Sequence, residues 1–186
     1  MESIIAHTSD NVHAFILDLD FQFHFSSLLR SDNSFNYRER TFHCELTYLE
    51  DVCREIVERL KVKYEDRLLS IVLFGSTAQG RRKLESDLDV IVILTDATES
   101  DRNVRSGLEN IMIEYEIPID SLVFTVDEFK YMLDQKHPLI LGVLLGYKVI
   151  YDRLGVSELL NEVEASLREE GWRRYKWSGL WIKPKH

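Results

Sequence analysis

IVLFGSTAQGRRKLESDLD, residues 71–89, is followed directly by the apolar run VIVIL, residues 90–94. The stretch opens with four apolar residues rich in β-branched side chains, which is typical of a buried strand. Gly75 ends this strand without a Cβ atom, and Ser76 is placed to cap the helix that follows. After a basic turn, a second buried strand is predicted at residues 87–94. The stretch therefore predicts two strands joined through a glycine-serine turn.

Two carboxylates open the second strand. Asp87 and Asp89 are two positions apart, so on a strand their side chains point to the same face, roughly 6 to 7 Å apart. Like charges at this separation repel each other unless a cation lies between them. Across from them, the backbone N–H groups around Gly75 and Ser76 suit phosphate oxygens. The pattern predicts a divalent-metal site opposite a phosphate-binding turn.

The spacing of these residues resembles a known family. Gly75-Ser76, followed eleven positions later by Asp87-x-Asp89, is similar to the signature of the polymerase β-like nucleotidyltransferases, above all their small prokaryotic "minimal" members. The resemblance covers roughly residues 45–151. It implies an α/β (α+β) fold with a short mixed sheet and flanking helices. The family carries a third carboxylate on a later strand, and Asp120 in the apolar segment IPIDSLVFTV is well placed to be that residue.

The resemblance also implies the chemistry. The expected reaction is a magnesium-dependent transfer of a nucleoside monophosphate to a hydroxyl acceptor, most plausibly AMP from ATP, with another nucleoside triphosphate as the other option. Two magnesium ions held beside a nucleotide can stabilise both the attacking and the leaving oxygen. The catalytic and metal-binding residues implied are Asp87, Asp89 and Asp120, and the nucleotide-binding residues are Gly75, Ser76 and Arg81.

Partners follow from the same resemblance. Small family members are often antitoxins encoded beside a HEPN-type toxin, and some adenylylate that toxin. A HEPN-type toxin is therefore one expected acceptor. One departure leaves an alternative open, because Gln79 follows Ala78 where members often carry a basic residue. Either Arg81 replaces that residue, or the chain is a catalytically weak, antitoxin-like binding module that clamps a basic HEPN-type partner.

Composition narrows the class of protein. The 186 residues are 45% hydrophobic and 30% charged, as in ordinary soluble globular proteins. A net charge of −9 argues against stable nucleic-acid binding and suits a basic partner. Neither a bilayer-spanning run nor a signal peptide is recognisable. Cys44 and Cys53 lie in one predicted helix, roughly 13 Å apart and too far for a disulfide, so we expect a reducing cytoplasm. Whether the chain forms a homo-oligomer stays open.

Three regions are predicted along the chain. Residues 1–42 form an N-terminal extension with a strand at about 15–25, which is an added edge strand, a dimer contact or sequence upstream of the family core. Residues 43–151 form the nucleotidyltransferase core, and residues 152–186 form a C-terminal helix with an aromatic and basic tail. Asp18-Leu19-Asp20 repeats the acidic pair without a glycine-serine turn, so we expect no metal there.

Hydrophobic periodicity predicts helices at residues 44–66 and 98–115, whereas the polar stretch at 26–40 indicates a loop or a short helical turn. Further helices are predicted from Asp127, after Pro138 and from Ser157. The expected helix caps are Thr98 or Ser100, His137 and Ser157. The three tryptophans of the tail are expected to seal it onto the core or a partner, with stacking on nucleic-acid bases as the alternative.

Overall fold

The computed structural model of this protein describes residues 35–82, 86–102, 104–175 and 180–184, apart from the side chains of residues 35–47, 105 and 106. The expected strand at 15–25, with Asp18-Leu19-Asp20, lies outside the described residues. The chain divides into two compact units, Met1–Leu46 and Thr47–His186. In the first unit the description covers only the beginning of one helix, and the sheet belongs to the second.

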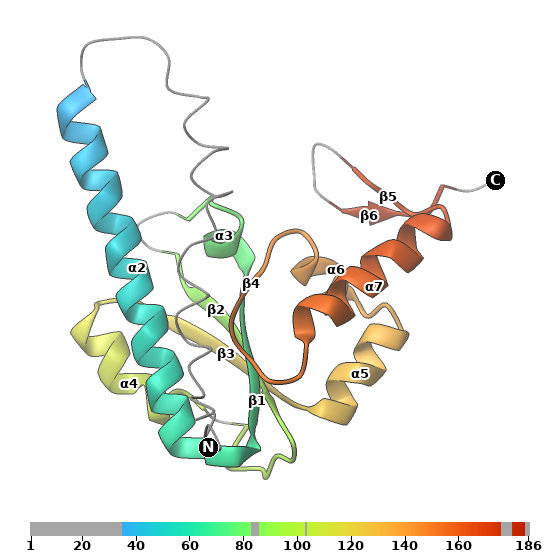
Figure 1. The fold of residues 1–186 in the computed structure, drawn as a ribbon, viewed down its shortest axis with the longest axis horizontal. Coiled ribbons are helices and arrows are strands. Elements are labelled where there is room, and N and C mark those ends of the chain that lie inside the picture. The colour runs from blue at the N-terminus through green and yellow to red at the C-terminus, as the bar shows by residue number, and fades with distance from the viewer. Residues whose placement is uncertain (1–34, 83–85, 103, 176–179, 185–186) are drawn as a thin grey trace, which may run out of the picture. The chain divides into compact units, whose positions relative to one another are not determined.

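After a first long helix, strands and helices alternate from residue 68 to residue 134, as the sequence predicts (Figure 1). They are α2 (Phe35–Tyr64), η2 (Glu65–Arg67), β1 (Leu68–Phe74), α3 (Gly75–Ala78), β2 (Leu88–Leu94), α4 (Arg105–Glu114), β3 (Ile119–Thr125), α5 (Val126–Asp134), α6 (Pro138–Val143), β4 (Lys148–Asp152), α7 (Val156–Glu169), β5 (Arg173–Arg174) and β6 (Trp181–Ile182).

Four of the strands form one mixed sheet in the order β3-β2-β1-β4. Strand β1 is antiparallel to both β2 and β4, whereas β2 and β3 are parallel. A parallel pair needs a crossover connection, and the segment containing α4 provides it. The expected short mixed sheet with flanking helices is confirmed. Strands β5 and β6 form a separate two-stranded ribbon.

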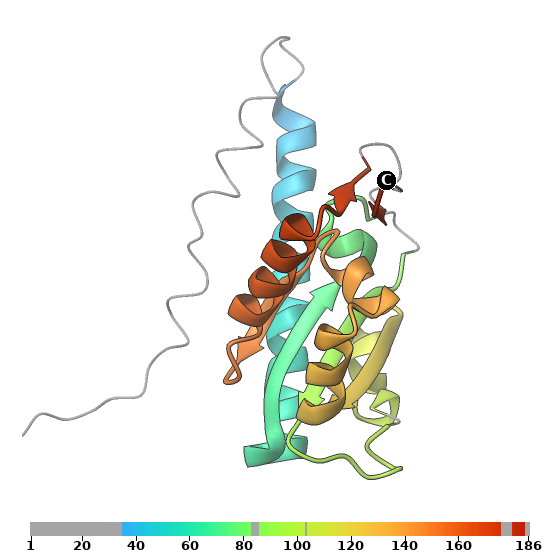
Figure 2. The same cartoon turned by 90° about the vertical axis from the view of Figure 1, so that its right-hand side faces the viewer.

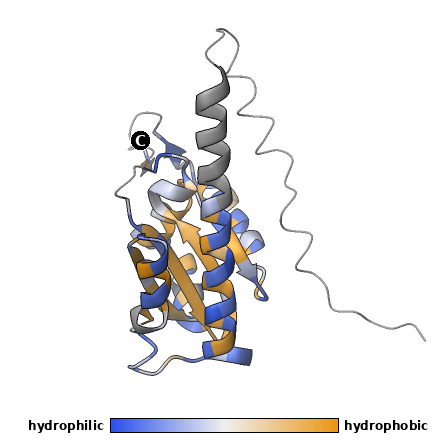
Figure 3. Cartoon of the chain, turned by 90° about the vertical axis from the view of Figure 1, so that its left-hand side faces the viewer, coloured by the Kyte–Doolittle hydropathy of each residue, from blue (hydrophilic) through white to orange (hydrophobic). Residues whose placement is uncertain are grey.

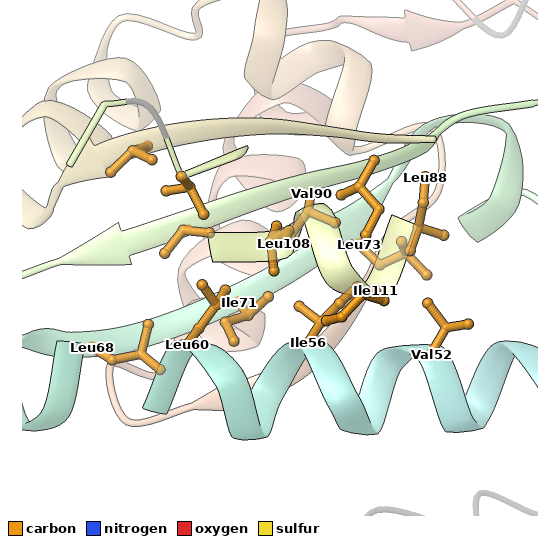
Figure 4. Close-up of a cluster of buried hydrophobic side chains, with 14 of the residues drawn as sticks. Val52, Ile56, Leu60, Leu68, Ile71, Leu73, Leu88, Val90, Leu108 and Ile111 are labelled. Carbon is orange, nitrogen blue, oxygen red and sulfur yellow. The ribbon is translucent and has the colours of Figure 1, made fainter. Parts of the chain in front are cut away.

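Helices cover both faces of the sheet, which explains why the central strands β1 and β2 carry apolar residues on both faces. Alternate residues of β2 enter two separate cores: Val90 and Val92 pack with α2 and α4, and Ile91 and Ile93 pack with α5, α6 and α7. Figure 4 shows the first core between α2 and the sheet, and Figures 1 and 2 show the helices on either side of the strands. In Figure 3 the strands are mainly hydrophobic, while the helices alternate between hydrophobic and hydrophilic residues.

Helix α2 begins earlier than the sequence predicts. It starts at Phe35, so residues 35–40 are helical rather than part of a loop, and no glycine or proline interrupts the sequence from there to Tyr64. One turn apart on this helix, Arg59 and Glu55 form an ion pair at 2.8 Å. Among the described helices, none has the length and apolar character needed to cross a membrane.

Helix α4 begins later than predicted, at Arg105, and neither Thr98 nor Ser100 caps it. Thr98 instead forms a turn with Asp101, donating its N–H at 2.9 Å and its hydroxyl at 2.8 Å to that carboxylate. The buried Asp101 carboxylate also accepts a hydrogen bond from Arg67. These contacts, led by the one from Arg67, hold the pKa of Asp101 well below its usual range. The local turn therefore competes successfully with helix formation.

The other two cap predictions differ in outcome. His137 caps α6 as expected, since its ring nitrogen accepts a hydrogen bond from the Leu139 N–H at 3.2 Å. Ser157 does not cap α7, because that helix begins at Val156 after Gly155. Asp152, the last residue of β4, takes the role instead. Its carboxylate accepts hydrogen bonds from the N–H groups of Leu154, Gly155 and Val156 at 2.9 to 3.0 Å.

The Asp152 carboxylate also connects the sheet to α7. It accepts a 2.7 Å hydrogen bond from the hydroxyl of Ser70, a fully buried residue on the neighbouring strand β1. Replacing Asp152 with alanine would remove the backbone bonds that start α7 and one of the partners of Ser70. We expect Asp152→Ala to lower the free energy of unfolding by about 1–3 kcal/mol, measured by urea denaturation.

Asp66→Ala is the matched control, because the Asp66 side chain is fully exposed and makes only a 3.7 Å ion pair with Arg153. We expect this variant to change the free energy of unfolding by less than about 0.5 kcal/mol. Equal urea midpoints for the two variants would show that Asp152 does not anchor α7.

Candidate functional site

The glycine-serine turn lies where β1 leaves the sheet. Gly75 has a left-handed backbone with a φ of +71°, a region that glycine enters without steric cost. The short helix α3 follows at once, and the turn closes with a hydrogen bond from the Arg81 N–H to the Ser76 carbonyl oxygen at 2.8 Å. Ser76 lies inside α3, and no side chain caps this helix, so the predicted cap at Ser76 is wrong.

Asp89 and Gly75 approach each other closely. Asp89 is the Cα partner of Phe74 in the antiparallel pair β1–β2, which places it beside the residue after Phe74. A Cβ atom added to Gly75 would lie 1.9 Å from Oδ2 of Asp89 and 2.8 Å from its Cγ. No other amino acid therefore fits at position 75 while the Asp89 carboxylate keeps its place. The missing side chain of Gly75 is what makes room for this carboxylate.

The second candidate carboxylate lies on the neighbouring strand. Asp120 on β3 is the Cα partner of Asp89 in the parallel pair β2–β3. Paired residues of neighbouring strands project to the same face of a sheet, so both carboxylates belong to the face covered by α5, α6 and α7. Asp87 precedes β2, two positions before Asp89, and it is exposed, as is Asp120. The fold thus brings together the three aspartates that the sequence singled out.

These aspartates influence one another electrostatically. The pKa of Asp89 is raised, mainly because the half-buried carboxylate loses hydration and further because of the negative charges of Asp120 and Asp87. Like charges that raise a carboxylate pKa are relieved by a cation. A carboxylate whose pKa is raised by burial and by neighbouring negative charges is typical of functional sites.

The donor set at this end of the sheet fits a magnesium ion. Magnesium prefers oxygen ligands and is usually held by one or two carboxylates together with phosphate oxygens. Asp89 and Asp120 supply such a pair, and Gly75 leaves room for it. Within the described part of the chain, no three His, Cys, Asp or Glu side chains are arranged closely enough to hold a metal by themselves. If magnesium binds here, Asp89 and Asp120 would supply part of its coordination shell and substrate oxygens would complete it.

Thr77 is a polar residue of the turn that the sequence analysis did not single out. Its hydroxyl oxygen is buried, and the described residues offer it no hydrogen-bond partner. Buried polar atoms in proteins nearly always find a partner, in the protein, in water or in a ligand. The signal available in the sequence was its position, directly after Gly75-Ser76.

Gln79, the departure from the family pattern, has two close neighbours. Its side-chain oxygen accepts a hydrogen bond from the guanidinium group of Arg81. On the other side, a Cβ atom added to Gly146 would lie 2.6 Å from Cγ of Gln79, so the loop between α6 and β4 packs closely against this side chain. Gln79 thus lies between the α6–β4 loop and the exposed Arg81. Arg81 is the residue that the sequence analysis suggested as a replacement for the basic residue missing at position 79.

Comparison with known proteins supports the same interpretation. Residues 53–152 match the family "Nucleotidyltransferase domain", which is more than half of the 186-residue chain. A protein of Methanocaldococcus jannaschii named "putative protein adenylyltransferase" is 36% identical over 107 residues, covering 56% of this chain and 73% of the relative. A second protein of that organism with the same description is 43% identical over 44 residues, covering 24% of this chain and 44% of the relative.

Solved structures resemble the fold at lower sequence identity. A crystal structure of a toxin-antitoxin with AMP-PNP aligns with a TM-score of 0.45 at 19% identity, over 63% of this chain and 87% of that chain. The spectinomycin adenyltransferase of Enterococcus faecialis, crystallised with ATP and spectinomycin, aligns with a TM-score of 0.44 at 13% identity, over 66% of this chain and 65% of that chain. These likenesses concern the fold alone. The family match and the relative with 36% identity decide the assignment: this chain belongs to the nucleotidyltransferase domain family and is a nucleotidyltransferase.

Proposed function

We propose that this protein transfers AMP from ATP to a hydroxyl group of another protein in a magnesium-dependent reaction. The observation that carries the proposal is the position of Asp89, whose carboxylate lies in the space left by Gly75 and beside Asp120 on the next strand. The family assignment supports nucleotidyl transfer, and the description of the M. jannaschii relative supports a protein as the acceptor and AMP as the group transferred.

Each residue of the site has a proposed part. Asp87, Asp89 and Asp120 would hold magnesium together with the nucleotide phosphates, and the bound metal would stabilise negative charge that develops on the reacting oxygens. The missing side chain of Gly75 leaves room for the Asp89 carboxylate beside the turn. Backbone N–H groups around Ser76 suit the phosphate oxygens.

Arg81 is proposed to take over the part of the basic residue that Gln79 replaces. Gln79 binds the Arg81 guanidinium group and is itself packed against Gly146, so the cation is held next to the turn rather than left to swing freely. An arginine contacts phosphate oxygens through a planar array of donors, which suits the charged tail of a nucleoside triphosphate. Among protein acceptors, the resemblance to small antitoxins makes a HEPN-type toxin the first to test.

A second candidate function is an antitoxin-like module that clamps a basic partner without turnover. The neutral side chain of Gln79 and the net charge of −9 favour it. Calorimetry separates the two functions, because only the nucleotidyltransferase needs to bind ATP with magnesium. No heat of ATP binding, together with tight association with a HEPN-type toxin, would support the clamp and contradict the enzyme.

The first test of the enzyme uses α-labelled ATP, magnesium and a HEPN-type toxin as acceptor. We expect Asp89→Asn to lower the rate of label transfer by about 100-fold, because the amide cannot supply the negative charge that holds the metal. Asp134→Asn, at an exposed position near the end of α5, is the matched control and should keep the rate of the unmodified protein. Transfer by Asp89→Asn at the unmodified rate would contradict the proposed metal site.

Two glycines offer a second test that isolates the space around Asp89. Gly75 and Gly80 have similar backbones, with φ values of +71° and +66°, but a Cβ atom on Gly80 would meet no atom within 4 Å. Both alanine variants should lose about 1–2 kcal/mol of unfolding free energy, because alanine is strained in a left-handed backbone. Only Gly75→Ala displaces the Asp89 carboxylate, and we expect its rate of AMP transfer to fall by about 100-fold.

The comparison between the two alanine variants is the decisive measurement. Thermal unfolding checks that both remain folded at the assay temperature, and the transfer assay is then run below both midpoints. Equal transfer rates for Gly75→Ala and Gly80→Ala would show that the close approach of Gly75 and Asp89 has no part in the reaction.

A further inference from the structure

The C-terminal ribbon, formed by β5 and β6, has two different faces. Arg173 pairs with Ile182, and Arg174 pairs with Trp181. The ladder continues with a hydrogen bond from the Tyr175 N–H to the Leu180 carbonyl oxygen at 2.8 Å. Cross-strand partners share a face and successive residues alternate between faces. One face therefore carries Arg173 and Tyr175 with their partners Ile182 and Leu180, and the other carries Arg174 and Trp181.

The face with Arg174 and Trp181 anchors the ribbon to the protein. Trp181 is only 9% exposed and belongs to the core between the sheet and α5, α6 and α7. Arg174 donates a hydrogen bond to the carbonyl oxygen of Leu145 in the α6–β4 loop. Packing and a charge-assisted hydrogen bond thus fix this face, so the other face is held outward.

The outward face is apolar and exposed, with basic residues beside it. Tyr175, Leu180 and Ile182 have exposed fractions of 53%, 58% and 45%. At the base of the ribbon lies an open cavity of about 410 Å³, in which Arg168 is paired with Glu164 at 2.7 Å and Arg173 and Arg174 are the other basic residues. Its lining consists of Glu164, Arg168, Trp172, Arg173, Arg174 and Trp181. On a chain with a net charge of −9, this combination of apolar and cationic groups stands out.

The ribbon is connected to the glycine-serine turn by direct contacts. Arg174 binds the carbonyl oxygen of Leu145, and the next residue of that loop, Gly146, packs against Gln79. Gln79 in turn binds Arg81 beside α3. Figures 1 and 2 both show the ribbon and α3 at the same end of the sheet. A molecule bound on the ribbon would therefore lie at the same end of the sheet as Asp89 and Asp120.

We propose that the outward face of the ribbon, with Arg173 as its cationic group, forms the docking surface for an acidic, apolar-containing segment of the acceptor protein. This inference rests on the proposed transfer to a protein hydroxyl. Aromatic and arginine side chains with an apolar centre are enriched in protein–protein interfaces, and arginine binds carboxylates with two parallel hydrogen bonds. The charge of the surface selects an acidic partner segment.

Two other occupants fit the surface less well. A single-stranded nucleic acid stacks successive bases on several open aromatic rings, and among the described residues the outward face offers one, Tyr175, because Trp181 lies on the anchored face and is 9% exposed. A second copy that docked through the same face would bring its own Arg173 close to that of the first chain, and these like charges would repel each other.

The test uses a fluorescently labelled random copolymer of glutamate and tyrosine as the probe, and a lysine–tyrosine copolymer as the opposite-charge control. We expect the full chain to bind the glutamate copolymer, measured by fluorescence anisotropy, and to ignore the lysine copolymer. Arg173→Glu and Ile182→Ser should each weaken binding at least about tenfold, since the first reverses the selecting charge and the second removes an apolar contact. Arg54→Glu is the matched charge reversal on an exposed arginine of α2 and should bind like the unmodified chain.

Four outcomes would overturn the docking surface. They are equal binding by Arg173→Glu and the unmodified chain, equal binding of both copolymers, displacement of the glutamate copolymer by a single-stranded oligonucleotide, and a dimer in sedimentation experiments that Ile182→Ser dissociates. The last two would assign the face to nucleic acid or to a second copy.

A further variant separates this inference from the proposed enzyme. Asp89→Asn should bind the glutamate copolymer as well as the unmodified chain does, although its rate of AMP transfer is expected to fall by about 100-fold. Copolymer binding that depends on Arg173, in a protein without transferase activity, would retain the surface and reject the enzyme. Transfer to a HEPN-type toxin that Arg173→Glu and Ile182→Ser leave unchanged would retain the enzyme and reject the surface.

Discussion

The register between β2 and β3 is the constraint on which the site depends. Asp89 lies beside Asp120 only because each residue of β2 has its fixed partner on β3. A shift by one residue would turn the side chains of β2 to the opposite face. Both faces of β2 are packed into cores, Val90 and Val92 on one side and Ile91 and Ile93 on the other. Such a shift would exchange side chains of different shape between the two cores and turn the Asp89 carboxylate toward the core under α2 and α4. Apolar packing thus sets the position of the charged groups.

The site itself works against the stability of the fold. Asp89 is half-buried near two other negative charges, and its pKa is raised as a result. Gly75 adopts a backbone that other residues reach only with strain, and Thr77 has a buried hydroxyl oxygen without a partner among the described residues. Such features persist where the surrounding structure determines them strongly, and they cluster at functional sites. Here β1 and β2, whose side chains are mostly buried, provide that surrounding structure.

Much of this fold could be predicted from the sequence because its strands are short, apolar runs that end at recognisable breaks. Gly75 marks the end of β1, and Pro118 precedes β3. The three aspartates were found from their spacing and from the family resemblance, and the structure places them at one end of the sheet. Local patterns were sufficient for these features, since short continuous apolar runs bounded by glycine or proline leave a clear mark in sequence.

The predictions that failed concern helix ends. Ser157 was expected to cap α7, but the carboxylate that does so belongs to Asp152 on β4, which also receives the buried hydroxyl of Ser70. Thr98 was expected to cap α4, but its hydroxyl donates a hydrogen bond to Asp101 instead. The same carboxylate also accepts a hydrogen bond from Arg67, which precedes β1. Both outcomes depend on residues that are far apart in sequence and meet only in the fold. The contact of Gln79 with Gly146 belongs to the same class.

Asp152 has a consequence for how this domain can be divided. The family match ends at residue 152, which is also where the carboxylate that begins α7 is located. Val156, Leu160 and Trp181 beyond it fill the same core as Ile91 and Ile93 of the central strand. A shortened gene product ending at residue 152 would expose that apolar layer to water. The Asp152 carboxylate would also lose the backbone N–H groups that donate hydrogen bonds to it. The residues after the family match are thus a structural part of the same domain, and an expression fragment should extend through the ribbon.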